Sequence, residues 1–151
     1  MSYNELIQLY FERSTAMQAY WNLYVVIVGG LLAFSSLRKQ PAAITTLIVS
    51  ILFALFAYEN LDAMYDTTRQ RFATIQAIKE FDSSGTNAAS SKQTRDLLEP
   101  TLTPATYNSV RATHVTSDIL TIAALWAMEL RRRRLKSITP AQKTVAGVTA
   151  Q

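Results

Sequence analysis

Residues 42–58 read AAITTLIVSILFALFAY, an apolar block without a charged side chain, and this block decides the fold. A helix that crosses the hydrocarbon core of a bilayer needs about 20 predominantly apolar residues. Pro41 precedes the block and suits the first turn of a helix, where its missing N–H costs no hydrogen bond. Glu59 ends the block. The sequence therefore predicts a membrane span over residues 42–58.

A second apolar block comes before the first and is joined to it by a very short basic loop. Residues 20–37 carry no charge, and Trp21 and Tyr24 suit the aromatic belt of a membrane interface. Arg38 and Lys39 lie in the loop between the two blocks. We therefore predict a helical hairpin whose first span covers residues 20–37.

The N-terminal segment predicts a helix that leads into the first span. Ser2 and Glu5 form the pattern S-x-x-E, a capping box that starts a helix at about residue 3. Apolar residues then recur at spacings of three and four, so residues 3–19 are predicted to form an amphipathic helix. We expect this helix to lie at the membrane interface or to continue directly into the span.

A third span is predicted over residues 114–131, although its apolar block is short. Between Asp118 and Glu129 there are about 10 uncharged residues, or roughly 15 Å of helix. A carboxylate near an interface costs less than one at the bilayer centre, and arginines can extend their charge to the headgroups. The final apolar block is followed by a basic run that we expect to anchor it on anionic lipid: Arg131, Arg132, Arg133 and Arg134. The alternative is a helix buried in a complex or lying on the interface.

Residues 59–113 are predicted to form an extramembrane stalk and loop, because the helix of the second span does not stop at Glu59. An apolar stripe at helical spacing continues beyond it as far as Phe81: Leu61, Met64, Tyr65, Thr68, Phe72, Ile75 and Ile78. This stripe must be covered, either by a core within the chain or by a partner. Residues 82–91 read as a flexible connection, and Thr103 with Pro104 read as the start of the final helix.

The chain is therefore predicted to be an all-α integral membrane protein with a single helical membrane domain over residues 1–136 and a flexible tail over residues 137–151. Basic residues favour the cytoplasmic side of a membrane. The Arg38–Lys39 loop and the Arg131–Arg134 run both belong inside, which requires an odd number of spans. We expect the N-terminus outside and the C-terminus in the cytoplasm, in a bacterial inner (plasma) membrane.

Few residues are candidates for a polar site. His114 stands one helical turn before Asp118, which can be a hydrogen-bonded pair or half of a catalytic or metal-tuning arrangement. On the predicted stalk, Glu59, Asp62 and Asp66 form one carboxylate stripe, which can be a solvated face or an ion-attracting vestibule. The chain has one His and no Cys, so the usual zinc sites are excluded within one copy.

No catalytic motif is present, so the sequence predicts a non-enzyme without a cofactor. We expect an accessory, scaffold or assembly subunit of a membrane complex, which contacts other membrane subunits or further copies of itself. The alternatives are a homo-oligomeric pore or membrane-perturbing effector, and an extracytoplasmic sensor. The expected partners include membrane lipids, anionic at the cytoplasmic face. Nucleic acid is not expected, because the basic run directly follows an apolar segment.

Overall fold

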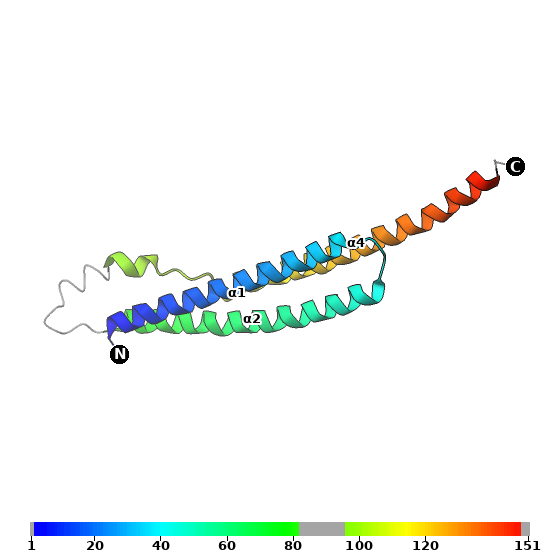
Figure 1. Cartoon of the computed structure of the whole chain (residues 1–151). Coiled ribbons are helices and arrows are strands. Elements are labelled where there is room, and N and C mark those ends of the chain that lie inside the picture. The colour runs from blue at the N-terminus through cyan, green and yellow to red at the C-terminus, as the bar shows by residue number, and fades with distance from the viewer. Residues whose placement is uncertain (1, 82–95, 149–151) are drawn as a thin grey trace. The chain divides into compact units, whose positions relative to one another are not determined.

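The structure is a computed structural model that describes residues 2–81 and 96–148, with side chains described as far as residue 137. Its long elements are α1 (Tyr3–Leu37), α2 (Ala43–Glu80) and α4 (Tyr107–Val148), and a short 3-10 helix, η1 (Glu99–Thr101), precedes α4. Figure 1 shows the three long helices, coloured by residue number from the N-terminus to the C-terminus. The described residues contain no strand, so the predicted all-α class is confirmed. The predicted flexible connection over 82–91 lies outside the described residues.

α1 is one continuous helix, so the predicted N-terminal helix and the first predicted span form a single element. It begins with the predicted capping box. The N–H of Ser2 donates to Glu5 Oε2 at 2.6 Å, and the N–H of Glu5 donates to Ser2 Oγ at 3.3 Å. These bonds satisfy two of the N–H groups that a helix start leaves unpaired. The hydrogen bond from the Ser2 backbone lowers the pKa of the Glu5 carboxyl.

The predicted start and end of the last helix both differ from the structure. α4 begins at Tyr107, and Thr106 caps it by accepting the N–H of Ser109 at 3.4 Å. Thr103 and Pro104 therefore precede the helix. Thr103 and Thr106 are both residues of a type that can cap a helix, and the sequence pattern favoured Thr103 because proline follows it. α4 also continues to Val148, so residues 137–148 of the expected flexible tail are helical.

The chain divides into two compact units whose boundaries fall within the long helices. Unit 1 comprises Met1–Leu23 and Glu59–Thr113, and unit 2 comprises Tyr24–Tyr58 and His114–Gln151. The boundaries at 58/59 and 113/114 are the residues at which the sequence analysis placed the change from stalk to span.

Unit 1 has an apolar core between the N-terminal part of α1 and the C-terminal part of α2. One cluster joins Leu6 and Tyr10 to Ile75 and Ile78, with Leu102 beside them. A second cluster is formed by three buried residues from three helices: Met17, Met64 and Val110. The N-terminal helix is therefore held by packing on α2.

The core face of α2 in unit 1 overlaps the predicted apolar stripe only in part. Ile75 is buried, but Tyr65 and Phe72 are 37% and 43% exposed, and Leu61 is only half-buried. The buried positions follow a mixed polar and apolar series at helical spacing: Asn60, Met64, Thr67, Thr68, Thr74, Ile75 and Ile78. Three of these threonines return their hydroxyl to the carbonyl four residues earlier, which lets them face a core. Leu61, Tyr65 and Phe72 are therefore the part of the predicted stripe that lies outside this chain's buried core.

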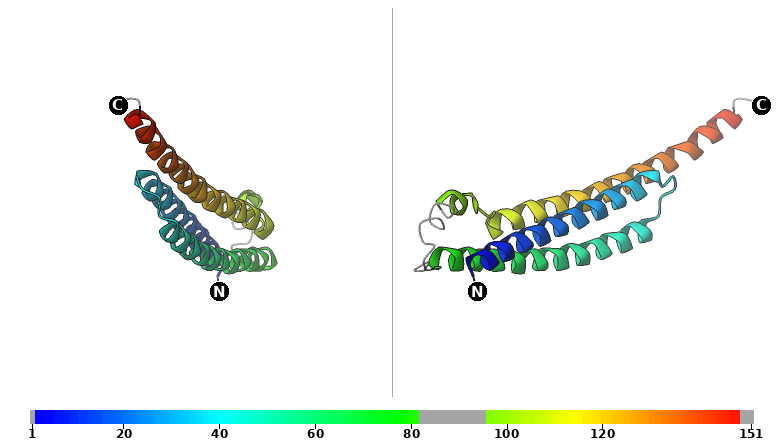
Figure 2. Two further views of the ribbon diagram at one scale, coloured as in Figure 1. Left: turned by 90° about the vertical axis from the view of Figure 1, so that its right-hand side faces the viewer. Right: turned by 60° about the vertical axis from the view of Figure 1, so that its left-hand side comes forward.

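Unit 2 contains the second half of α1, the first half of α2 and most of α4, and α1 lies beside α4 here (Figures 1 and 2). Its interior holds polar residues, which we call the polar seam: Ser35, Thr46, Ser50, His114, Thr121 and Glu129. Tyr24, Phe53, Ala57 and Leu125 fill the rest of that interior.

The outside of unit 2 is apolar, which reverses the pattern of a helix in a water-soluble protein. Large aliphatic side chains are mostly exposed on all three helices: Val25, Val26, Leu37, Ile44, Ile51, Leu52, Leu55, Ile119 and Leu120. α1 and α2 are long and apolar enough to cross a membrane, and only 11% and 28% of their most apolar windows are buried inside the structure. Most residues in these apolar windows are therefore not packed inside the chain.

Candidate functional site

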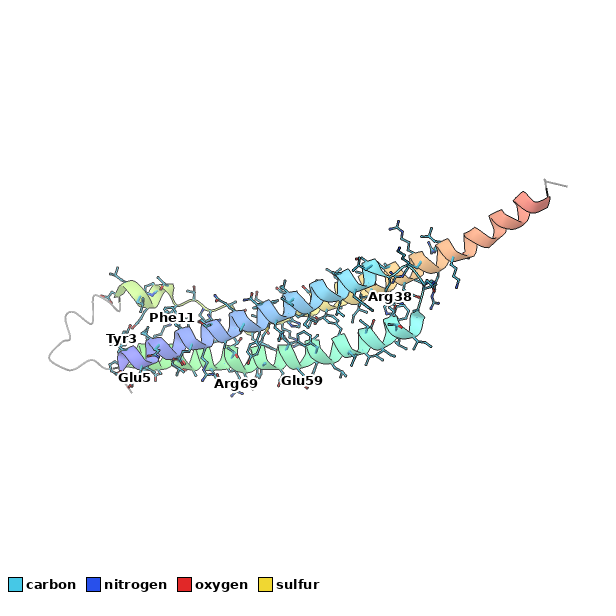
Figure 3. All side chains as sticks on the ribbon, viewed as in Figure 1. Tyr3, Glu5, Phe11, Arg38, Glu59 and Arg69 are labelled. Carbon is cyan, nitrogen blue, oxygen red and sulfur yellow. The ribbon has the colours of Figure 1, made fainter. Side chains whose placement is uncertain are left out.

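The carboxylate stripe on α2 is a solvated helix face in this structure. Glu59, Asp62 and Asp66 are all exposed, and Figure 3 shows Glu59 and Arg69 pointing away from α1. Asp66 and Arg69 line a shallow depression of about 370 Å³ with Gln70 and Ala73. The described part of the chain holds no group of three or more metal-ligating side chains. The stripe therefore offers no enclosed cation site within one chain.

The predicted pair of His114 and Asp118 forms, and Tyr24 completes it. His114 Nδ1 lies 2.9 Å from Asp118 Oδ2, and the Tyr24 hydroxyl donates to Asp118 Oδ1 at 2.8 Å. The Tyr24 and His114 rings are 4.3 Å apart, and His114 is completely buried. Each carboxylate oxygen of Asp118 thus has a partner. One helical turn of α4 supplies His114 and Asp118, and α1 supplies Tyr24.

This cluster joins side chains from all three helices of unit 2. The Tyr24 ring also packs on Phe53 of α2, with centroids 6.3 Å apart, so the cluster ties all three helices of unit 2. The groove beside it, about 390 Å³, is lined by Tyr24 and Ser117 but not by His114. Its remaining walls are Val25, Val28, Gly29, Leu120 and Thr121. His114 therefore does not line this groove.

A second polar cluster centres on Glu129, which the sequence analysis treated only as the end of an apolar block. The Glu129 carboxylate is completely buried. Its Oε1 accepts Arg133 Nε at 3.2 Å, and its Oε2 accepts Arg132 Nη2 at 3.5 Å. Oε2 also accepts the backbone N–H of Ala42 at 3.3 Å. Arg38 Nη2 stands 4.0 Å away, so three arginines surround one carboxylate.

The Glu129 cluster fastens α4 to the turn between α1 and α2, where Figure 3 places Arg38. Arg132 Nη1 donates to the carbonyl of Ser35 at 2.5 Å, and its Nη2 donates to Ser35 Oγ at 3.3 Å. Arg38 donates to the carbonyl of Ala42 at 3.2 Å and to Thr46 Oγ1 at 3.3 Å. The carbonyl of Ser35 belongs to the last turn of α1, where backbone carbonyls have no N–H partner within their own helix.

The Arg131–Arg134 run is therefore divided between two tasks. Arg132 and Arg133 turn to Glu129, whereas Arg131 and Arg134 are exposed, with no ion pair among the described residues. Lipid anchoring stays a prediction for the run, and Arg131 and Arg134 are its freest members. The sequence carries one signal for the cluster, an acid followed by arginines three and four residues later. It carries none for the contacts with the distant turn.

Comparison with protein-family models, with curated proteins and with solved structures finds no match to this chain.

Proposed function

We propose that the chain is a non-catalytic integral membrane protein with three spans, which serves as an accessory, scaffold or assembly subunit of a membrane complex. The observation that carries the membrane assignment is the reversed polarity of unit 2, with a polar seam inside and aliphatic side chains outside. An exposed apolar surface of this extent belongs in lipid or against a partner. Helices in lipid associate through small and hydrogen-bonding residues, as the polar seam does.

The two clusters support a third span in α4. Its weakness as a span is the pair of acids at Asp118 and Glu129, because a charge facing hydrocarbon is costly. Asp118 is hydrogen-bonded to Tyr24 of α1, and the buried Glu129 is hydrogen-bonded to Thr46 of α2. The lipid-facing side of α4 then presents exposed aliphatic residues such as Ile119 and Leu120. With its acids hidden, α4 can meet hydrocarbon on its outer side.

The distribution of charge supports an outside N-terminus and a cytoplasmic C-terminus. Lys39 on the short loop is exposed, as are Arg131, Arg134 and Lys136 near the end of the third predicted span. Positive charge at both places favours the cytoplasmic side for both. Unit 1, with Glu59, Asp62 and Asp66 exposed, then lies outside.

The buried polar groups argue for a structural part rather than a pore or an enzyme. Thr46, Ser50 and Thr121 are buried within one chain, so their hydroxyls do not line a channel between copies. His114 and Glu129 are both engaged with neighbouring side chains. The surface left for contacts lies on unit 1, where Phe11 and Phe72 are 51% and 43% exposed. These aromatics favour docking to another protein.

The test is the composition and size of the particle that contains the tagged full chain, isolated in a mild detergent. We expect other polypeptides at fixed stoichiometry, measured by native mass spectrometry. A ring of one defined number of copies, with no other subunit, would instead support the pore. If the chain at native expression level is isolated as a monomer with no other polypeptide bound to it, the subunit role is contradicted.

A further inference from the structure

A basic pocket lies beside the Glu129 cluster, at the end of unit 2 where the α1–α2 turn meets α4. It has a volume of about 340 Å³. The turn contributes one part of its wall and α4 the other: Lys39, Gln40 and Pro41, with Arg132, Leu135 and Lys136. Three cationic side chains from two separate elements therefore line one pocket, and none of the described residues in its wall is acidic.

The charges of the two lysines in this pocket are not neutralised within the described residues, whereas Arg132 is paired with Glu129. Glu129 is surrounded by Arg38, Arg132 and Arg133, and none of its contacts reaches a lysine. Lys39 and Lys136 make no ion pair or hydrogen bond in the part of the chain that the structure describes. The side chain of Arg132 is nine-tenths buried, and its Nε is a buried donor without an acceptor. A buried donor of this kind is normally satisfied by a partner or a ligand.

We propose that this pocket binds the phosphate group of an anionic phospholipid. Lysines are point charges for phosphate, and arginine and glutamine add directional N–H donors. The site is polar on Lys39, Gln40 and Lys136 and apolar on Pro41 and Leu135. It therefore matches a headgroup with a glycerol backbone next to it. The proposal rests on the proposed membrane location and adds a defined binding site to it.

The surroundings favour a lipid over a free phosphate ion. Leu135 in the wall is 57% exposed. Leu37 and Ile44, which flank the turn in sequence, are 79% and 77% exposed. An acyl chain attached to the bound headgroup has apolar surface to follow on both sides, which a free anion does not use. Clusters of cations at the cytoplasmic ends of spans are typical sites for anionic lipid headgroups.

The experiment compares two double variants of the full chain in detergent micelles. Lys39→Gln with Lys136→Gln removes two charges from the pocket. Arg69→Gln with Arg111→Gln removes two charges from exposed positions of unit 1 that do not line it. Binding of phosphatidylglycerol is titrated by native mass spectrometry in buffers of raised ionic strength, with phosphatidylcholine as the neutral lipid. Screening then suppresses the general attraction of the surface.

We expect the pocket variant to bind phosphatidylglycerol at least about tenfold more weakly than the parent, and the control variant to bind within about threefold, because a charge-assisted contact is stronger than a screened one. Equal loss in both variants would replace the pocket by a general surface attraction and overturn the proposal. Equal retention in both would do the same.

Two further arms separate the sources of failure. Inorganic phosphate at millimolar concentration should not displace the lipid, and displacement by it would overturn the assignment to a phospholipid. The orientation of the chain in the membrane is measured independently, by cysteine labelling of cells. Failure of that labelling contradicts the proposed topology, whereas lipid binding in micelles is read without reference to it.

Discussion

Replacing the carboxylate of Glu129 leaves Arg38, Arg132 and Arg133 without the one acid they share. We expect Glu129→Gln to lower the free energy of unfolding by about 3 kcal/mol, because a broken buried pair leaves uncompensated charge. The figure is at the low end because the Arg133 side chain is 48% exposed and can turn to water. Denaturant unfolding in a mild detergent, followed by circular dichroism, measures the change.

The matched control is Glu59→Gln, which removes the same charge from an exposed position on α2. Its free energy of unfolding should stay within about 0.5 kcal/mol of the parent. If Glu129→Gln unfolds at the same denaturant concentration as Glu59→Gln, the cluster contributes no stability to the fold.

At the scale of a residue, contacts within one helix could be predicted from the sequence, whereas contacts between helices could not. The pair of His114 and Asp118 is local, one helical turn apart, and it could be predicted. Its third member, Tyr24, comes from another helix and was predicted only as an interfacial aromatic. Contacts of this kind depend on how α1 and α4 face each other, which a single sequence does not encode in its spacing.

At the scale of elements, α2 presents two faces in unit 1 with different predicted roles. Ile78 is completely buried in the core, whereas Phe72 is 43% exposed. We expect Ile78→Asp to reduce expression and folded yield strongly, because it buries an unpaired charge. We expect Phe72→Asp to fold like the parent and to lose the co-purifying subunits. Expression level and native mass spectrometry of each variant measure the two effects.

The Phe72→Tyr variant is the control, since it keeps an aromatic ring on the exposed face. It should retain its partners. A Phe72→Asp variant that keeps every partner would show that this face is solvated, and a misfolded one would place Phe72 in the core instead.

The helices themselves could be predicted because their causes are local. Blocks without charge, the Ser2–Glu5 capping box and the Arg38–Pro41 break gave the extent of α1 and α2 to within a residue or two. The face of α2 could not be predicted as well. The predicted stripe supplies buried members such as Met64 and Ile78, but Asn60, Thr67 and Thr74 share the core face without belonging to the stripe. Threonine can hide its hydroxyl in its own helix, so apolar periodicity alone misplaces the interior.

For the whole molecule, the proposed orientation predicts which ends of the chain are accessible from outside a cell. The chain has no natural cysteine, so each introduced thiol is read without background. Gln76 and Ser137 are both exposed in the structure. In intact cells, a membrane-impermeant maleimide should label Gln76→Cys and leave Ser137→Cys unlabelled.

Permeabilised cells provide the control, because both variants should then react equally. Labelling of both thiols in intact cells, or of Ser137→Cys alone, would contradict three spans with an outside N-terminus. Labelling of both thiols would place Ser137 outside the membrane. Labelling of Ser137→Cys alone would reverse the predicted orientation.

The Glu129 cluster also implies an order of events during synthesis. In the proposed topology, Arg38 and Ala42 leave the ribosome long before Glu129 does, so both are already in place when α4 emerges. An α4 inserted alone would keep the pairs of Glu129 with Arg132 and Arg133, but it would lack Arg38 and the N–H of Ala42. Beside a finished hairpin, the carboxylate gains both of these partners. We therefore expect the first two proposed spans to help the third to insert, and a chain without the hairpin should insert α4 less completely.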